Sequence, residues 1–362
     1  MKTITTACVN HKGGVAKTTS LLNLAAGIAR MYKKRVCIID ADPQANTTMA
    51  AFGEEMASLP REVLLESALQ DCMQDTPPEL KPQKWLEKVD ILPASLDLAA
   101  TEVIMYTTPG REFLFREIVK GLEEKYDHIL IDCPPSLGII TQNALMASDY
   151  VIIPTDGNYF AMKGIEKIHY IIGLLKRKLG AEVRILGYFM TKYNARRKLD
   201  MDIRESLVRS LGDGVFETVI RSNVALGEAQ YKAQSIFDYA PSSNGADDYR
   251  ELVKEFLGRI KKINKYILAI ILKNTKKNEK ISEKLSAKIL LCYNHKDFLK
   301  GAKYHGKRIF CIRIKPYSTI HYADASGFEE GGAVFGWNKR LPQSDGTGGR
   351  RKGDDPFPHR KE

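Results

Sequence analysis

A phosphate-binding loop is the first chemistry that the sequence offers, in the stretch HKGGVAKTT that begins at His11. The usual pattern of such a loop is G-x-x-x-x-G-K-[ST]. Lys17 and Thr18 match its end, whereas His11 and Ala16 stand where the pattern has glycine. Lys17 can reach the β- and γ-phosphates of a nucleotide, and the Thr18 hydroxyl can bind Mg²⁺. The stretch therefore predicts a nucleotide site with an altered loop.

Two adjacent glycines and an extra lysine fill the middle of this loop. Gly13 and Gly14 give the backbone the freedom to curl consecutive N–H groups around an anion at a helix N-terminus. Ala16 adds only a methyl group, which the loop can tolerate if the φ of this residue is negative. Lys12 is a further cation ahead of the glycines. The alternative is a glycine turn that caps an ordinary helix, and the strand and helix patterns on either side favour phosphate binding.

Acidic residues follow two other apolar runs. Asp40 and Asp42 end the run in IIDADPQANTT, and Asp132 ends the run in ILIDCPPSLG. Carboxylates at the carboxyl ends of parallel strands lie at the crevice where such sheets bind ligands. There they can hold Mg²⁺ or orient an attacking water. One such Asp is often a helix cap or turn residue, but the three together, in this chain order, favour a nucleotide site.

The elements that must position these residues follow from the hydrophobic pattern of residues 1–260. Short apolar runs alternate with helical patterns, which predicts an α/β fold with a mostly parallel central sheet flanked by helices. The predicted strands are TITTACVN, RVCIIDAD, VDILPAS, HILIDCPP, YVIIPTD and RILGYFMTKY, with VFETVI as one more candidate. Their Ile, Val and Leu residues do not alternate with polar ones, as expected for strands covered on both faces. Residues 75–83 predict a Pro-broken surface connection, and ADDYRELVKEFLGRI predicts a closing helix that ends at Ile260.

The charge divides the 362 residues into two parts. Residues 1–260 hold 32 Lys and Arg against 34 Asp and Glu, whereas residues 261–362 hold 23 against 10. The basic excess therefore belongs to the last hundred residues, and it does not make the first part a nucleic-acid binder. We predict a nucleotide-binding domain over 1–260 and a basic C-terminal extension over 261–362, partly helical and then disordered.

Several classes of protein are disfavoured. The sequence begins without the features of a signal peptide and holds no apolar run of membrane-spanning length, which predicts a cytoplasmic protein. None of the six cysteines belongs to a CxxC pair, so structural zinc, iron–sulfur clusters and a disulfide framework are poorly supported. Cys8, Cys37 and Cys133 lie in or beside apolar runs and are predicted to be small buried hydrophobic residues.

Taken together, KGGVAKTT, IIDADPQANTT and ILIDCPPSLG resemble the deviant Walker A, A′ and B motifs of the ParA/MinD family of P-loop ATPases. The stretches DYVIIPTDGNYFAMKGI and SNVALGEAQYKAQSIFDYAPSSNGADDY resemble its ParA partition branch, and the chain looks like the short, Soj-like type. The resemblance covers residues 1–260. It implies a P-loop NTPase fold of the nucleotide-sandwich dimer type, with ATP and Mg²⁺ as cofactors.

The resemblance also implies roles for individual residues. Lys12 looks like the signature lysine that reaches across a dimer to the partner's ATP, which would couple dimerisation to hydrolysis as an arginine finger does. Asp42 looks like the residue that orients the attacking water, and Asn194 resembles a contact to the adenine edge. The implied catalytic residues are Lys12, Asp42 and Lys17, and the implied metal residues are Thr18, Asp40 and Asp132. The implied nucleotide-binding residues are Lys12, Gly13, Gly14, Val15, Ala16, Lys17, Thr18, Thr19 and Asn194.

The partners implied by the family are a second copy of the chain, a ParB-like centromere-binding protein and non-specific DNA around the nucleoid. Phosphate contacts need clustered positive charge rather than base readout. The candidate DNA-binding residues are Arg196, Arg197, Lys198, Arg221 and Lys232. The sequence departs from the family at VIRSNV, where Arg221 replaces a proline and Ser222 replaces the usual DNA-contacting arginine.

Two other readings compete with DNA partition. A MinD-like ATPase that cycles on a membrane to position the division site is supported by RIKKINKYILAIILKNTKK, where isoleucines could line an interfacial helix (Ile260, Ile263, Ile267, Ile270 and Ile271). Apolar residues nearly encircle that segment, which weakens this reading, so a membrane partner is not expected. A metal-cluster carrier or reductase is disfavoured because the cysteines are unpaired.

Overall fold

The computed structural model describes residues 2–157, 161–276, 303–304 and 307–308. Contacts divide the chain into two units, residues 1–297 and 298–362. In the second unit, β8 (Lys303–Tyr304) pairs antiparallel with β9 (Lys307–Arg308). The first unit holds all the candidate site residues.

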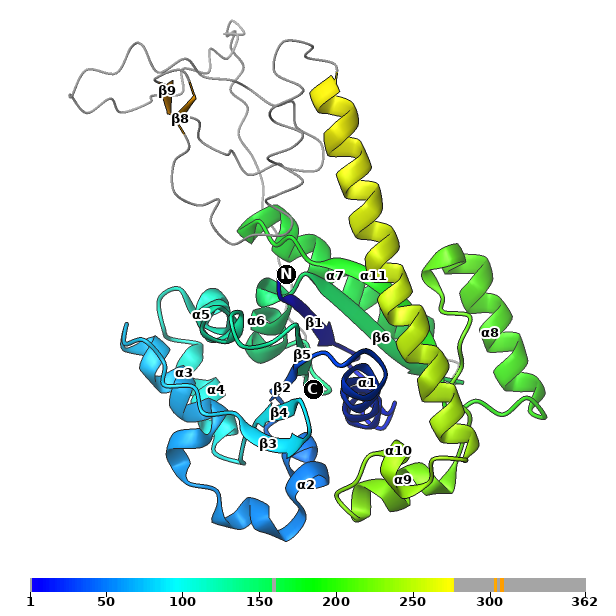
Figure 1. Ribbon diagram of the computed structural model, residues 1–362. Coiled ribbons are helices and arrows are strands. Elements are labelled where there is room, and N and C mark those ends of the chain that lie inside the picture. Colours follow the sequence, from blue (N-terminus) through cyan, green and yellow to red (C-terminus); the bar gives the residue numbers. More distant parts are fainter. Residues whose placement is uncertain (1, 158–160, 277–302, 305–306, 309–362) are drawn as a thin grey trace, which may run out of the picture. The chain divides into compact units, whose positions relative to one another are not determined.

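A seven-stranded sheet with the order β3-β4-β2-β5-β1-β6-β7 forms the centre of the first unit (Figure 1). All neighbouring strands are parallel except β3 and β4, which confirms the predicted α/β class. The strands are β1 (Ile4–Cys8), β2 (Val36–Asp40), β3 (Gln83–Leu86), β4 (Val89–Leu92), β5 (His128–Asp132), β6 (Tyr150–Asp156) and β7 (Arg184–Thr191).

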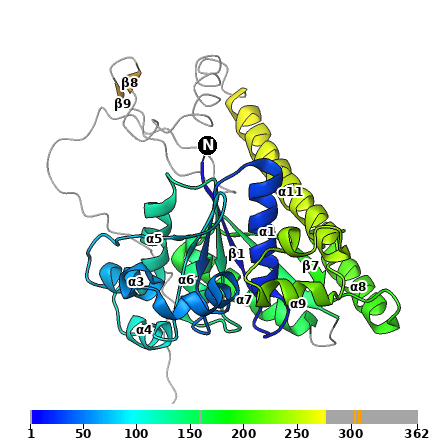
Figure 2. The same cartoon turned by 60° about the horizontal axis from the view of Figure 1, so that its bottom comes forward.

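Helices cover both faces of this sheet. Figure 2 shows α1 and α11 on one side and α5 and α6 on the other. The α-helices are α1 (Lys17–Tyr32), α2 (Asn46–Phe52), α3 (Leu65–Met73), α4 (Leu98–Met105), α5 (Leu114–Leu122), α6 (Ile139–Ala147), α7 (Ala161–Leu179), α8 (Lys198–Leu211), α9 (Val224–Tyr231), α10 (Ile236–Tyr239) and α11 (Asn244–Lys276). Because parallel strands need crossover connections, this arrangement places the two helical layers on opposite faces.

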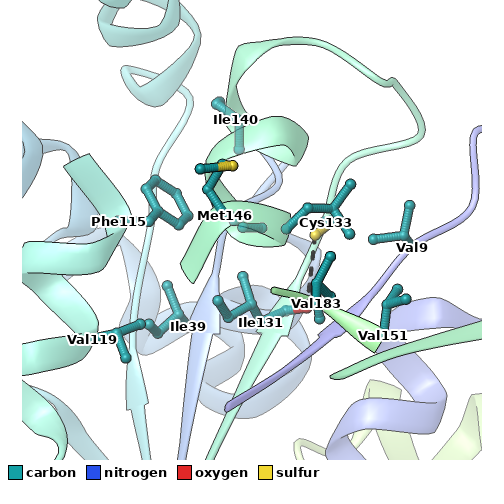
Figure 3. Packing of buried hydrophobic residues seen from close by; sticks show 14 of the residues in the cluster. Val9, Ile39, Phe115, Val119, Ile131, Cys133, Ile140, Met146, Val151 and Val183 are labelled. Atoms are coloured by element: carbon teal, nitrogen blue, oxygen red, sulfur yellow. Dashed lines mark hydrogen bonds between the residues drawn. The ribbon is translucent and has the colours of Figure 1, made fainter. Parts of the chain in front are cut away.

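Alternate residues of each central strand enter separate hydrophobic cores. Leu130 packs with α1 and α11, while its neighbour Ile131 packs with α5 and α6. Figure 3 shows Ile131 on this second side, close to Ile39, and Phe115 with Met146 above them. Each fully buried side chain of this kind contributes roughly 1.5–3 kcal/mol relative to an exposed one.

The three cysteines predicted to be buried are buried. Cys8, Cys37 and Cys133 are free and fully enclosed. Burial raises the pKa of the Cys133 thiol well above its usual value, because the charged thiolate would lose its hydration. These cysteines are therefore packing residues of the sheet.

Two strand predictions were wrong. The edge strand β3 was missed because its sequence, QKWL, is short and half polar. VFETVI does not form a strand; Val215 makes an isolated parallel bridge to Tyr188 instead. The surface connection predicted over residues 75–83 ends where β3 begins at Gln83.

The closing helix does not end at Ile260, as the sequence predicted, but continues as α11 to Lys276. Neither Gly nor Pro occurs between Ile260 and Lys276 to stop it. Ile260 is buried and Ile263 packs against the core under α1, while the Tyr150 hydroxyl donates to Asn264 Oδ1 at 3.0 Å. The predicted domain boundary at residue 260 thus falls within a continuous helix.

Of the five isoleucines in the proposed interfacial helix, two contact the protein itself. Ile260 and Ile263 pack against the domain core. The side chains of the other three, Ile267, Ile270 and Ile271, and most of the predicted disordered extension lie outside the described residues. Among the described residues, no helix combines the length and apolar character that crossing a membrane requires.

Candidate active site

The predicted phosphate loop opens onto a cavity of about 1610 Å³ at the carboxyl edge of the sheet. A cavity of this size can hold a nucleotide and exceeds an ordinary small-ligand pocket. It is lined by Gly13, Gly14, Ala16, Lys17, Thr18 and Thr19, by Asp42, Gln44 and Asn46, by Thr191 and Lys192, and by residues 220–223, 226–227 and 230–233. The loop, the motif IIDADPQANTT and α9 therefore meet around one space.

Two residues of the loop adopt left-handed backbone conformations. Gly14 has φ +73° and Ala16 has φ +61°. The condition of a negative φ for Ala16 is not met, because this residue is the N-cap of α1 and the left-handed turn there leads the loop into the helix. A left-handed conformation costs alanine roughly 1–2 kcal/mol, so the loop is held in place by its surroundings.

Contacts beneath the loop supply that support. Lys17 is buried, and its Nζ donates to the carbonyl oxygen of Lys12 at 3.4 Å. The Thr191 hydroxyl at the end of β7 donates to the carbonyl oxygen of Val15 at 3.1 Å. Val15 itself is buried and does not line the cavity. The N-terminus of α1 and the Lys17 ammonium together make the loop favourable for phosphate.

Asp132 is the acceptor for two hydroxyl groups next to the loop. Its Oδ2 accepts from Thr18 Oγ1 at 2.6 Å and from Thr47 Oγ1 at 2.7 Å, while its buried Oδ1 has no hydrogen-bond partner. Burial raises the pKa of Asp132 to about 6, and the two hydroxyl donors oppose that rise. A buried carboxylate oxygen without a partner is a site suited to a cation or an ordered water.

These residues fit Mg²⁺, which prefers oxygen ligands and binds through one or two carboxylates together with substrate phosphates. Thr18 and Asp132 would hold the ion, directly or through water, and the bound ion would neutralise charge on the phosphates. Among the described residues, no group of three or more His, Cys, Asp or Glu side chains could hold a metal ion.

Asp40 and Asp42 have different surroundings. Asp40 is fully buried, and its Oδ2 accepts from the Thr48 amide at 2.8 Å and the Thr48 hydroxyl at 2.7 Å. Burial, with the charge of Asp132, raises the pKa of Asp40 to about 7. Asp42 lines the cavity, where its Oδ1 accepts from the Gln44 amide at 3.0 Å. Only Asp42 of this pair is placed to act on a molecule in the cavity.

Lys12 points to a neighbour in its own chain. Its Nζ pairs with Asp156 Oδ2 at 2.5 Å, and its amide donates to Asn10 Oδ1 at 3.0 Å. Asn10 in turn donates to the carbonyl oxygen of Pro154 on β6 at 2.7 Å. Lys12 does not line the cavity. The Lys17 ammonium thus contacts the backbone of the phosphate loop, whereas the Lys12 ammonium pairs with Asp156.

The predicted adenine and DNA residues divide into two groups, residues 194–198 outside the cavity lining and Arg221 with Lys232 in it. Asn194 is exposed outside the cavity lining, and its Oδ1 accepts from the Arg196 amide at 2.9 Å in a turn. Arg197 and Lys198 are also exposed, where α8 begins. Arg221 and Lys232 line the cavity instead.

Arg221 makes an ion pair that sequence reasoning did not find. Its Nη2 lies 2.5 Å from Asp248 Oδ1, and its Nε donates to both oxygens of that carboxylate. The hydrogen bond to Asp248 raises the pKa of the Arg221 guanidinium. The positive charge of Arg221 is therefore partly neutralised by Asp248 of the same chain.

Three further residues of the site were missed. Thr47 binds Asp132, Asp156 binds Lys12, and Gln230 Oε1 accepts from the Thr19 hydroxyl at 3.0 Å. Asp156 could have been found, because it ends a buried strand as Asp40 and Asp132 do. Nothing in the sequence marks Gln230, which lies 211 residues from its partner.

Known proteins show which family the chain belongs to. A family model described as an AAA domain matches residues 1–185. The sporulation initiation inhibitor protein Soj of Bacillus subtilis is 37% identical over 251 residues, which are 69% of this chain and 96% of Soj. The chromosome partitioning protein ParA of Myxococcus xanthus is 33% identical over 69% of this chain and 86% of its own length. The chain belongs to the ParA/MinD family of P-loop ATPases.

Solved structures agree with the fold of this ParA/MinD-family ATPase. Cobyrinic acid a,c-diamide synthase of Mycobacterium smegmatis, with a bound ATP analog and magnesium, has a TM-score of 0.61 and 28% identity over 72% of this chain and 96% of that chain. A plasmid partition protein of Borrelia burgdorferi, at 22% identity over 71% of this chain and all of its own, has a TM-score of 0.60 and shares the fold. The chain is thus an ATPase that uses ATP and Mg²⁺, as the sequence predicted.

Proposed function

We propose that this ATPase partitions DNA in the cytoplasm, on the nucleoid. It dimerises on ATP, binds DNA non-specifically as the dimer, and is released when a ParB-like, centromere-bound partner stimulates hydrolysis. The observation that carries this proposal is the similarity to Soj and ParA over nearly their whole lengths, at 37% and 33% identity. It is supported by the position of the two loop lysines.

The ion pair of Lys12 supports a role for that lysine between subunits. Lys17 points under the loop, whereas Lys12 pairs with Asp156 and leaves the cavity without its charge. A partly exposed lysine can exchange an ion pair within the chain for a phosphate of a second subunit at little cost, because such pairs contribute only about 0–1 kcal/mol. Hydrolysis would then require two subunits.

The proposed DNA contacts are best supported at the start of α8. Arg196, Arg197 and Lys198 are exposed and consecutive. Arg221 is paired with Asp248, and the Lys232 ammonium lies 5.5 Å from the centre of the Tyr231 ring. We therefore assign the non-specific phosphate contacts first to the α8 cluster, residues 196–198, and only then to Arg221 and Lys232.

The test measures the ATPase rate with and without DNA and with a candidate ParB-like protein. A DNA shift assay and a vesicle sedimentation assay, each with ATP, accompany it. Partition predicts ATP-dependent DNA binding and stimulation by both DNA and the partner. Binding to vesicles instead would support the MinD-like alternative.

A third outcome would favour an activity like that of the cobyrinic acid a,c-diamide synthase of Mycobacterium smegmatis. In that case neither DNA nor vesicles would bind, and a carboxylic acid acceptor would be needed for ATP turnover.

Loss of DNA binding on changing residues 196–198 to alanine, with ATP binding retained, would locate the contact. An unchanged DNA affinity would show that the α8 cluster is not the DNA surface.

A further inference from the structure

A tryptophan on the edge strand contacts the wall of the nucleotide cavity from outside. Trp85 Nε1 donates to the carbonyl oxygen of Ala233 at 3.3 Å, across a sequence separation of 148 residues. Ala233 lies in the turn between α9 and α10 and lines the cavity, but Trp85 does not line it. Any influence of Trp85 on a bound nucleotide must therefore act through this turn.

Trp85 lies at an irregularity in the pairing of β3 with β4. The register between β3 and β4 shifts between Lys84 and Leu86, which places Trp85 at the irregular residue. Such bulges turn a side chain away from its regular alternation and occur often beside active sites. Trp85 is partly buried and packs against the core that contains α1 and α11. Packing holds the ring while its N–H remains available to Ala233.

The carbonyl oxygen that accepts this bond belongs to the turn that follows α9. Ala233 has φ +52°, a conformation that alanine adopts at a cost. On its other side, Gln230 is tied to the phosphate loop through the Thr19 hydroxyl at 3.0 Å. The wall formed by residues 230–233 is therefore held from two directions, by the first turn of α1 and by β3.

We propose that Trp85 is a positioning residue for the nucleotide site. Its hydrogen bond fixes residues 230–233 before ATP enters, so that the cavity does not have to order this wall during binding. Preorganisation of this kind increases affinity by removing an entropic cost. The proposal concerns nucleotide binding alone, and it stands or falls independently of DNA partition.

The variant Trp85→Phe keeps an aromatic ring and removes only the N–H donor, and Tyr126→Phe is its matched control. The Tyr126 hydroxyl donates to Asp90 Oδ2 at 2.8 Å, and neither residue lines the cavity. Calorimetry with a non-hydrolysable ATP analogue and Mg²⁺ gives Kd, and steady-state kinetics give KM and kcat. We expect Trp85→Phe to raise Kd and KM about three- to tenfold with kcat nearly unchanged, the effect of one lost hydrogen bond. The control should leave Kd within about twofold of the wild type.

Fluorescence provides a second measurement that does not depend on the stability of the variant. The chain has two tryptophans, so Trp337→Phe leaves Trp85 as the single emitter. Because the wall is fixed before ATP enters and Trp85 does not line the cavity, its emission maximum should stay nearly the same as the analogue binds. The proposal is overturned if the emission maximum shifts strongly on binding, because the ligand would then be what orders this wall. It is also overturned if Trp85→Phe binds the analogue with the Kd of the wild type, whether or not the variant loses unfolding free energy.

Discussion

At the residue scale, we predict that Lys17 serves ATP binding and that Asp42 serves turnover. Both residues line the cavity; Lys17 donates to the carbonyl oxygen of Lys12 in the phosphate loop, and one oxygen of Asp42 accepts from the Gln44 amide. We expect Lys17→Ala to abolish ATP binding, since it removes the fixed cation of the phosphate site. Asp42→Ala should keep ATP, accumulate dimers and stop turnover. Calorimetry and size-exclusion chromatography measure these outcomes, and normal hydrolysis by Asp42→Ala would refute its role.

Lys12 should be needed for hydrolysis but not for ATP binding, because its ammonium pairs with Asp156 outside the cavity. By analogy with an arginine finger, Lys12→Ala is expected to lower kcat by about 10³-fold. Mixing Lys12→Ala with Asp42→Ala subunits tests the direction of action. If Lys12 acts across the dimer, the mixture gains an activity that neither variant has alone. A mixture that stays inactive would mean that Lys12 acts within its own chain.

The residues that sequence alone could identify are those in contiguous motifs. The phosphate loop, Asp42 and Asp132 were found because each follows an apolar strand and sits at a recognisable spacing. The partners of these residues come from distant parts of the chain: Arg221 pairs with Asp248, and Trp85 with Ala233. Such pairs depend on how helices close over the sheet, which no local pattern specifies.

At the element scale, the walls of the cavity are built from left-handed turns occupied by alanine. Ala16, Ala45 and Ala233 have φ of +61°, +52° and +52°. Ala16 and Ala233 line the cavity, and Ala45 precedes α2, which begins with the cavity residue Asn46. Glycine adopts this conformation without the steric cost that alanine incurs. The elements around the site are therefore less stable than their fold permits.

Replacing each of these alanines by glycine should raise the free energy of unfolding by about 1 kcal/mol, since relief of the left-handed conformation outweighs the added chain entropy. Ala100→Gly on the exposed face of α4 is the matched control and should lower it by about 0.5–1 kcal/mol. Urea denaturation measures both. Destabilisation at all four positions alike would show that the three turns carry no strain.

The elements also show why the strands were easier to predict than the helix ends. Central strands buried on both faces leave long apolar runs, whereas the edge strand β3 has a mixed sequence and escaped detection. The end of α11 was misplaced because its amphipathic pattern fades after Ile260 while the helix continues. A helix ends where a capping residue or a helix-breaking residue follows it. A fading amphipathic pattern marks only the point where the buried face of the helix ends.

At the scale of the whole molecule, the chain joins a nearly neutral ATPase to a basic C-terminal segment. Residues 277–362 hold 18 Lys and Arg against 10 Asp and Glu. The contacts of Ile263 and Asn264 show that the first turns of α11 beyond Ile260 belong with the ATPase. A cut that tests the extension should therefore follow Lys276, where α11 ends.

Truncation after Lys276 should leave ATP binding and ATP-dependent dimerisation intact, because the cavity and both hydrophobic cores lie before that residue. It should weaken DNA binding and flatten the dependence of log Kd on log salt, whose slope for duplex DNA is about 0.9 per phosphate neutralised. Truncation after Lys262 is the comparison, since it also removes Ile263 and the acceptor of the Tyr150 hydroxyl, and it should lower stability. DNA titrations at several salt concentrations, with size-exclusion chromatography in ATP, measure these effects. If the chain cut after Lys276 fails to dimerise with ATP, the basic extension is part of the ATPase; if its salt slope is unchanged, the extension does not touch DNA.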